Sequence, residues 1–302
     1  MFAIQIRDYG AVDVFEEVET PRPKIKPKQV LVKQHAVAID PYDVKFRQGL
    51  MGKDQQPPIV TGSSVAGGEV VAVGDKVQAF KVGDRVAASP HLRSYAEYVA
   101  VGQSQLAQIP ATVSYELAAA AALGVQTAYQ LTEKVLELHP GQSVLVHGGA
   151  GSIGFAVLQF AKHHGIHDLY TTASGQGVGF LRNFDTRLRV IDYRKEDFTK
   201  KVPLFDRIVD PIGGSVLQKS LTVLKSTGKL ISTVADADDP RVEHFFMKSN
   251  GGEDLAAVLH QLATDELYLE IAAVAPFNVE NLQRFQQAQH VVGKLVLTFA
   301  SN

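Results

Sequence analysis

The sequence contains no cysteine among its 302 residues, so neither a disulfide bond nor a metal site with a thiolate ligand can form. It also lacks long apolar segments. The longest uninterrupted run of apolar residues and glycine, Leu117–Val125, has nine residues, whereas a membrane-spanning helix needs about 20. The N-terminal stretch MFAIQIRDYG carries Arg7 and Asp8 inside any apolar core, which is not typical of a signal peptide. We therefore expect a soluble, cytoplasmic protein.

An excess of charge of one sign is absent as well. The formal net charge is −2, and lysine and arginine are scattered along the chain, so we expect neither nucleic acid nor a membrane as a partner. What the chain does have is 45% apolar and 21% charged residues, which is the composition of an ordinary globular protein. Its length is typical of about two domains.

Two kinds of pattern divide the chain. Residues 1–122 are rich in short strand patterns such as QVLVKQHAVAI and YAEYVAV, punctuated by glycine and proline. From Leu123 onward, strand and helix patterns alternate, which is typical of a parallel sheet with right-handed crossovers. The expected strands there are Ser143–His147, Asp168–Thr172, Leu188–Asp192, Phe205–Asp210, Lys229–Val234 and a sixth near Glu243–Lys248.

The end of the chain returns to strand character. The strand pattern LYLEIAAVAPF is followed by a polar helix over Asn281–His290 and by a second strand pattern, GKLVLTF. These last two strands could rejoin the first domain. We therefore expect one domain from residues 1–122 with 267–302 and a second domain from residues 123–266.

A glycine-rich turn, GGAGSIG, follows the strand pattern VLVH and precedes a helix with apolar residues on one face. Gly149, Gly151 and Gly154 fit the pattern G-x-G-x-x-G: the first permits a tight turn, the second lets the backbone approach a pyrophosphate, and the third allows close packing of helix and sheet. Helix amides starting near Ser152 and Ile153 would face the phosphates. This context favours a dinucleotide site over a glycine turn that serves packing alone.

The acidic residue that usually binds the ribose, about 20 residues beyond such a turn, is missing. Ser174 stands at that place, and Asp168 comes too early, where the strand begins. A serine can bind a 2′-phosphate that a carboxylate would repel. Arg182, Tyr193 and Arg194 are nearby candidates for further donors, although each arginine is equally compatible with a solvated face. The sequence therefore predicts NADP(H) rather than NAD(H).

The order of the motifs resembles the medium-chain dehydrogenase/reductase superfamily, specifically its zinc-independent, quinone-oxidoreductase-like branch. The matching segments are VVAVGDKVQAFKVGDRV (Val70–Val86), SYAEYV (Ser94–Val99), LGVQTAY (Leu123–Tyr129), GGAGSIG, VIDYRKEDF, DRIVDPIGG and GKLVL (Gly293–Leu297). The resemblance implies an α/β fold in which a Rossmann doubly wound parallel sheet is joined to a GroES-like β-barrel domain. It also implies a homodimer through the edge of the Rossmann sheet.

The resemblance implies further cofactor contacts, residue by residue. Thr127 would touch the nicotinamide, Pro211 and Gly213 would lie in the loop after the fourth strand, and Val234 would end the fifth strand near the carboxamide. Lys294 would approach the cofactor from the C-terminal segment. In this family the position of Tyr193 commonly contacts the phosphate on the adenosine, in agreement with the argument from charge.

Zinc-dependent relatives use cysteine, histidine and acidic ligands that this chain lacks. Asp40 stands at the position of their catalytic cysteine, and Gly62-Ser63-Ser64 replaces their GHE stretch. A tetrahedral zinc site needs several strong ligands, and only Asp40 remains. We therefore expect no metal site.

Three residues in AIDPYDVKFRQG are candidates for catalysis. Burial could raise the pKa of Asp40 and leave it as a proton donor, or Asp40 could only cap the turn before Pro41. Tyr42 and Lys45 are alternative donors to a substrate oxygen.

These observations predict an NADPH-dependent oxidoreductase that transfers hydride to quinones or α,β-unsaturated carbonyls without zinc. The developing negative charge spreads over a conjugated acceptor, so the protein mainly has to position the reactants. Two alternatives remain: an NADPH-binding sensor or structural protein without turnover, and a zinc-type alcohol dehydrogenase.

Overall fold

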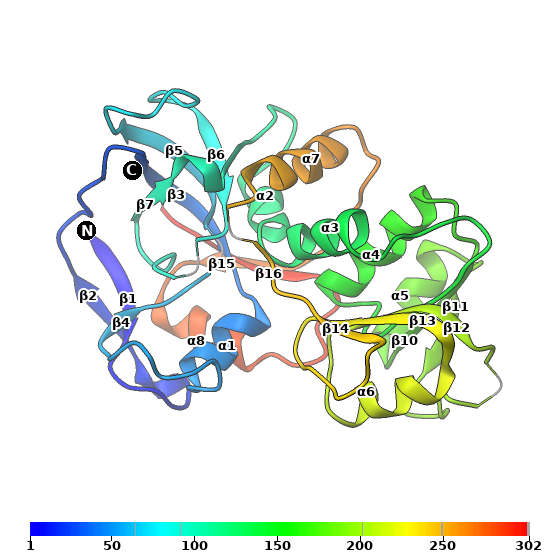
Figure 1. Ribbon diagram of the computed structural model, residues 1–302. Helices are drawn as coiled ribbons and strands as arrows, with labels where there is room; N and C mark the ends of the chain where they lie inside the picture. The colour runs from blue at the N-terminus through cyan, green and yellow to red at the C-terminus, as the bar shows by residue number, and fades with distance from the viewer. Residues whose placement is uncertain (64, 91, 201, 249, 301–302) are drawn as a thin grey trace. The chain divides into compact units, whose positions relative to one another are not determined.

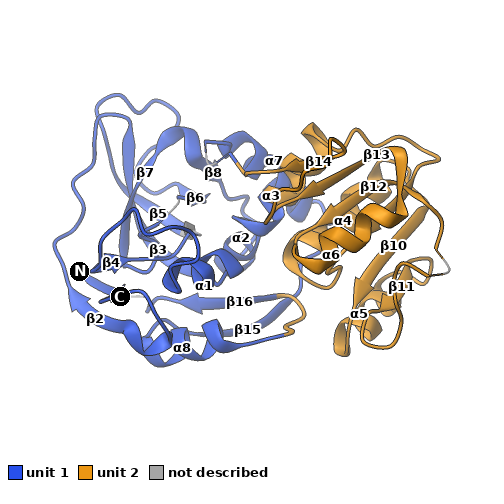
Figure 2. Cartoon of the chain, turned by 60° about the horizontal axis from the view of Figure 1, so that its bottom comes forward, with its two compact units in different colours: residues 1–126, 248–289, 294–302 blue, residues 127–247, 290–293 orange. Residues whose placement is uncertain are grey.

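The computed structural model of the chain describes residues 1–63, 65–90, 92–200, 202–248 and 250–300. The chain forms two compact units, coloured separately in Figure 2. Unit 1 comprises residues 1–126, 248–289 and 294–302, and unit 2 comprises residues 127–247 and 290–293.

Unit 2 is built on a six-stranded parallel sheet with the strand order β11-β10-β9-β12-β13-β14 (Figure 1). This order, running outward in both directions from the first strand, is that of a Rossmann doubly wound sheet. The Rossmann part of the expected fold class is thereby confirmed. The elements are α3 (Gly124–Lys134), β9 (Ser143–Val146), α4 (Ser152–His163), β10 (Asp168–Ala173), α5 (Gln176–Phe184), β11 (Arg189–Asp192), β12 (Phe205–Asp210), α6 (Ser215–Ser220), β13 (Leu224–Ser232) and β14 (Val242–His244).

The last two strands of this sheet differ from their predicted bounds. Strand β13 begins at Leu224 rather than at Lys229, because Leu224 pairs with Phe205 across a register shift. Strand β14 ends at His244 rather than at Lys248. His244 pairs with Ser232, the last residue of β13, so the chain beyond it has no neighbouring strand on which to continue.

Unit 1 contains a seven-stranded sheet, ordered β15-β16-β3-β5-β6-β8 with β7 also paired to β3, and a three-stranded sheet ordered β2-β1-β4. Strand β16 pairs antiparallel with β3, so the C-terminal strands do rejoin the first domain as expected. The strands are β1 (Phe2–Ile6), β2 (Phe15–Glu19), β3 (Gln29–Ala38), β4 (Ile59–Val60), β5 (Val65–Val73), β6 (Arg85–Ala88), β7 (Tyr98–Gly102), β8 (Leu106–Gln108), β15 (Ile271–Pro276) and β16 (Lys294–Thr298).

The helices of unit 1 are α1 (Pro41–Arg47), α2 (Tyr115–Ala121), α7 (Gly252–Ala263) and α8 (Val279–Gln287). The expected division of the chain placed residues up to 266 in the nucleotide domain, but α7 packs against β8 and α2 in unit 1. Gly252 comes so close to the carbonyl of Leu106 that a Cβ would clash with it. A helix seated this closely on β8 shares the core of unit 1.

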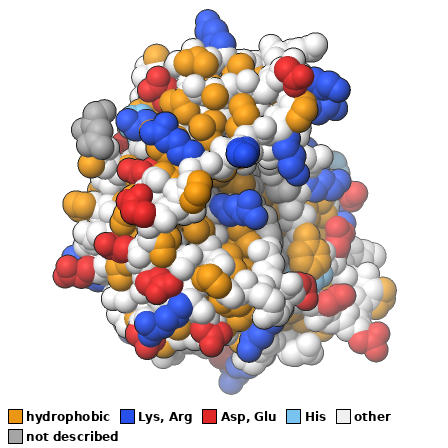
Figure 3. All heavy atoms as spheres, turned by 90° about the vertical axis from the view of Figure 1, so that its left-hand side faces the viewer, with side chains coloured by type: hydrophobic (Ala, Val, Ile, Leu, Met, Phe, Trp, Pro, Cys, Tyr) orange, Lys and Arg blue, Asp and Glu red, His pale blue; other side chains and the backbone are white. Residues whose placement is uncertain are grey.

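Within the described residues, no helix is long and apolar enough to cross a membrane. Acidic and basic side chains are interspersed on the face drawn in Figure 3. This mixture agrees with the formal net charge of −2.

Candidate functional site

The glycine-rich turn lies between β9 and α4, where each glycine has its own steric reason. Gly148, which the motif does not include, has φ +63° and makes the tight turn that the sequence assigned to Gly149. A Cβ on Gly149 would clash with Thr171 Oγ1, and a Cβ on Gly154 would lie 2.5 Å from the carbonyl oxygen of Gly148. A Cβ on Gly151 would lie 3.3 Å from the same carbonyl oxygen. The fold therefore tolerates a side chain at Gly151 better than at Gly149 or Gly154.

The start of α4 carries the features of an anion-binding turn. The helix begins at Ser152, as predicted, with Gly151 as its N-cap and the half-buried Ile153 next in its first turn. The Ser152 hydroxyl is buried and lacks a hydrogen-bond partner within the described residues. Buried polar atoms are almost always paired, so an orphan hydroxyl beside free helix amides fits a ligand that supplies acceptor oxygens. The residues therefore fit a dinucleotide pyrophosphate.

His147 ties this turn to the sheet through a buried network. The backbone N–H of Gly148 donates to Thr172 Oγ1 (3.2 Å), which lies 3.0 Å from His147 Nδ1. His147 Nε2 lies 2.8 Å from Ser220 Oγ, and that hydroxyl donates to the carbonyl of Val216 (2.7 Å). Because the Ser220 hydroxyl gives its hydrogen to Val216, Nε2 of His147 must carry a proton and donate it to Ser220 Oγ. Burial lowers the pKa of His147 to about 4.

The buried imidazole predicts a pH-dependent stability. His147 has a folded-state pKa of about 4, below its ordinary 6.5, so between these values the unfolded chain binds a proton that the native chain does not. Its contribution is therefore full above pH 6.5 and lost as the pH falls to 4, by about 3 kcal/mol. Urea unfolding of the protein and of His147→Gln between pH 4 and 7.5 measures this difference. Parallel stability curves for the two proteins would contradict it.

The carboxyl ends of β10 and β11 bring two of the predicted phosphate ligands together. Ser174 Oγ donates to Tyr193 Oη at 2.9 Å, and Tyr193 is 46% exposed. Arg194 follows directly, and its Nη2 lies 3.0 Å from Nε2 of His290, a residue that the sequence did not predict here. Arg182 is exposed in the last turn of α5, and none of the described hydrogen bonds links it to the other three.

The other predicted cofactor residues of unit 2 lie at the ends of β12 and β13, with one exception. The Asp210 carboxylate accepts hydrogen bonds from the backbone N–H groups of Ile212 (2.9 Å) and Gly213 (3.0 Å), which shapes the loop that begins with Pro211. A Cβ on Gly213 would lie 2.9 Å from a methyl group of Val234, so these two segments touch. Thr127 is buried in α3 and is not at a strand end.

Lys294 and Asp40 form a buried ion pair in unit 1, which the sequence did not predict. Asp40 is the N-cap residue of α1, and its Oδ1 accepts a hydrogen bond from Lys294 Nζ at the start of β16. Lys294 also donates to the carbonyl of Ile39 at 3.3 Å. The side chains are only 6% and 3% exposed, so each charge depends on the other for compensation.

Asp43 was missed at the sequence level, and it is the centre of a buried network beside this pair. Its carboxylate accepts hydrogen bonds from the backbone N–H of Asp40 (3.0 Å), from the N–H (2.9 Å) and hydroxyl (2.6 Å) of Ser63, and from the Tyr95 hydroxyl (3.2 Å). Burial, with the Asp40 charge next in importance, raises the pKa of Asp43. The spacing D-P-x-D was a readable signal, because an acid three residues after an N-cap is the pattern of a capping box.

Tyr42 and Lys45 lie one helical turn apart on α1 and are both half-buried. Burial raises the pKa of Tyr42 to about 12, so its phenol remains protonated and able to donate a hydrogen bond. The Tyr42 ring packs near Phe46, with ring centroids 6.3 Å apart.

The residues in unit 1 do not fit a catalytic zinc ion. Lys294 brings a positive charge to the Asp40 carboxylate, and both donor groups of Ser63 point at Asp43. Ser64 lies outside the described residues. Among the residues that are described, no cluster of three or more histidine, cysteine or acidic side chains is placed to hold a metal.

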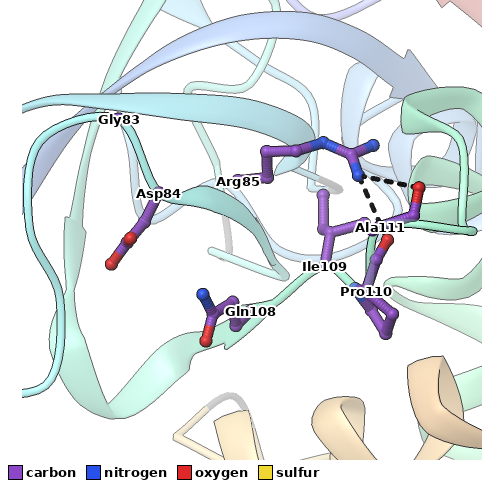
Figure 4. Close-up of a pocket in the computed structure, with 7 residues that line it drawn as sticks. All are labelled: Gly83, Asp84, Arg85, Gln108, Ile109, Pro110 and Ala111. Atoms are coloured by element: carbon purple, nitrogen blue, oxygen red, sulfur yellow. Dashed lines mark hydrogen bonds between the residues drawn. The ribbon is translucent and has the colours of Figure 1, made fainter.

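A surface pocket in unit 1 is lined by none of these residues (Figure 4). Its one basic side chain, Arg85, donates to the carbonyls of Pro110 (3.1 Å) and Ala111 (3.5 Å), shown as dashed lines, and also to that of Val113 (2.7 Å). Because its guanidinium is engaged by backbone acceptors, the pocket offers little to an anionic ligand.

Comparison with known proteins places both parts of the chain. Residues 26–140 match the alcohol dehydrogenase GroES-like domain, and residues 188–297 match the zinc-binding dehydrogenase domain. A 2-methylene-furan-3-one reductase of Solanum lycopersicum is 33% identical over 98% of this chain and 79% of its own length. The chloroplastic NADPH-dependent alkenal/one oxidoreductase of Arabidopsis thaliana is 32% identical over 96% of this chain and 77% of its own.

Solved structures agree. The quinone oxidoreductase of Coxiella burnetii superposes with a TM-score of 0.89 at 29% identity, over 100% of this chain and 99% of that one. A mycobacterial protein in complex with NADPH superposes with a TM-score of 0.88 at 27% identity, over 99% of this chain and 100% of that one. The sequence relatives and the shared fold together show that this chain belongs to the quinone-oxidoreductase-like branch of the medium-chain dehydrogenase/reductase superfamily.

Proposed function

We propose that the protein is an NADPH-dependent reductase of quinones or α,β-unsaturated carbonyls. The observation that carries the proposal is the carboxyl edge of the unit 2 sheet. There a glycine turn with an orphan Ser152 hydroxyl is followed by Ser174 at the end of β10, in place of an acid, and by Tyr193 at the end of β11. The tomato and Arabidopsis relatives are named as reductases of conjugated carbonyl compounds, which supports the same chemistry.

Each group at this edge has a part in holding the dinucleotide. The amides of Ser152 and Ile153 would bind the pyrophosphate at the start of α4, whereas the Gly151 N–H donates within the turn to the carbonyl of Gly148 (2.9 Å). NADPH supplies the hydride when bound. The phosphate on its adenosine ribose would lie at Ser174, Tyr193 and Arg194, with Arg182 as an outer charge, and its nicotinamide end would be bounded by Thr127, Pro211, Gly213 and Val234.

The substrate side would be formed in unit 1 by α1 and β16. Because Oδ1 of Asp40 accepts a hydrogen bond from Lys294 Nζ, we assign Asp40 the role of orienting the Lys294 ammonium rather than that of a proton donor. Lys294 and the protonated phenol of Tyr42 would then donate to the substrate oxygen on which negative charge develops, with Lys45 as a further cation one turn along. Donors fixed before the reaction stabilise such charge without reorganisation.

A screen of NADPH consumption tests this function. We expect quinones, enals and enones to be reduced, and saturated aldehydes and ketones to be reduced far more slowly because their charge stays on one oxygen. The Asp40→Asn variant should retain NADPH binding but lose turnover about 10-fold or more, since an amide holds the Lys294 ammonium less firmly. Untouched quinones, enals and enones would refute the proposal, and tight NADPH binding without turnover would favour a sensor.

We also propose that the protein acts as a cytoplasmic homodimer. The absence of cysteine is compatible with a reducing compartment, and the family resemblance supports a dimer through the edge of the unit 2 sheet. A light-scattering mass near the 32.7 kDa of one chain would contradict the dimer.

A further inference from the structure

Four residues, 290–293, leave unit 1 and pack with unit 2, although α8 before them and β16 after them belong to unit 1. A methyl group of Val292 comes within 3.9 Å of the position of a Cβ on Gly177, at the start of α5. His290 reaches the end of β11, where its Nε2 lies 3.0 Å from Arg194 Nη2. The segment therefore places an imidazole against an arginine of the proposed phosphate site.

The chemistry of arginine and histidine determines which of the two side chains donates the hydrogen bond. A guanidinium has five N–H donors and no acceptor, so Arg194 is the donor and Nε2 of His290 is the acceptor in this arrangement. Both side chains are exposed. An exposed arginine loses considerable rotamer freedom when it closes on a ligand, and an acceptor that already holds the guanidinium reduces that loss.

The backbone of His290 is held in an uncommon conformation. Its φ is +55°, in the left-handed region that few residues other than glycine adopt. Such conformations persist where the surrounding structure determines them, and they concentrate at functional positions. Arg194 in turn follows Tyr193, whose hydroxyl accepts the hydrogen bond of Ser174. Four side chains from three separate segments are thus placed along one edge of the sheet.

We propose that His290 is a positioning residue that gives this protein its preference for NADPH over NADH, by holding the Arg194 guanidinium ready for the 2′-phosphate. The inference rests on the proposed function in one respect, the placement of that phosphate at the ends of β10 and β11. His290, which lies 96 residues after Arg194 in the sequence, is an additional determinant of cofactor preference. The ligand chemistry is that of a phosphate monoester on a ribose, which NADH lacks.

Direct binding measurements test this role without any need for turnover. The chain has no tryptophan, so the nicotinamide fluorescence of NADPH and NADH reports their dissociation constants with little interference from the protein. We expect His290→Ala to reduce the preference for NADPH about five- to tenfold while the NADH dissociation constant stays unchanged. His290→Gly tolerates the positive φ and should behave in the same way. His290→Asn also tolerates it and keeps an acceptor, so it should retain most of the preference.

A double-mutant cycle separates action through Arg194 from direct contact. In an Arg194→Ala background, His290→Ala should change the preference no further. His260→Ala removes an exposed imidazole from α7 in unit 1 and serves as the matched control, with the preference unchanged. Equal weakening of both cofactors, an unchanged preference, or independent effects of the two substitutions would each overturn the inference. A protein that binds NADPH but reduces no acceptor would refute the proposed activity. The effect of the His290 substitutions on the preference for NADPH could still be measured in such a protein.

Discussion

Replacing Gly154 by alanine is expected to weaken NADPH binding by about 100-fold or more and to destabilise the native chain. The new Cβ would lie 2.5 Å from the carbonyl oxygen of Gly148, 2.9 Å from its carbon and 3.0 Å from the Cα of Gly149. These are backbone atoms, which cannot rotate away, so α4 or the turn must shift. Overpacking of this kind costs about 1–3 kcal/mol, and the shift also displaces the amides that would hold the pyrophosphate. Fluorescence titration and urea unfolding measure the two effects.

Two further alanine variants separate the loss of pyrophosphate binding from the loss of native structure. At Gly151 the nearest atom to a Cβ is 3.3 Å away, so Gly151→Ala should fold nearly normally yet still obstruct the approach of the pyrophosphate to the backbone. Gly179 lies inside α5 with no atom within 4 Å of a Cβ, so Gly179→Ala should leave binding intact and stabilise the chain by up to about 1 kcal/mol. Unchanged NADPH affinity in both Gly151→Ala and Gly154→Ala would place the cofactor elsewhere.

Replacing Lys294 by methionine is expected to destabilise the native chain by about 3–5 kcal/mol and to abolish turnover. The substitution leaves the Asp40 carboxylate, only 3% exposed, without the cation that compensates it. Loss of the proposed donor to the substrate oxygen accounts for the loss of turnover. Unfolding by urea at pH 7 measures the stability, and NADPH oxidation with a quinone measures the activity.

The reason for this destabilisation can be checked by removing the charge that is left behind. Adding Asp40→Asn to Lys294→Met should recover most of the stability but none of the activity, because the amide is uncharged and remains at the N-cap of α1. Lys229→Met is the matched control, since its ion pair with Glu243 is 31% and 45% exposed and contributes less than about 1 kcal/mol. Failure of the double variant to regain stability would show that Lys294 acts through packing rather than through charge.

Local sequence patterns suffice to predict some elements of the fold and not others. Strand β9 and the start of α4 agree with their predicted positions, because a buried strand, a glycine turn and an amphipathic helix each leave a pattern over neighbouring residues. The start of β13 was missed, because a partner strand, rather than the local sequence, extends it to Leu224. The placement of α7 in unit 1 likewise depends on its contact with β8.

The sequence by itself determined the alternation of strands and helices in unit 2, the glycine turn and the serine that replaces the ribose-binding acid, because these features depend on residues close together in the chain. Only the tertiary structure joined Asp40 to Lys294 and Arg194 to His290. Each pair is formed by residues far apart in the sequence, and burial and orientation decide whether a charge is paired, free or neutral. No local pattern records the distance between two such side chains, so the electrostatics of this site emerge only when the chain is folded.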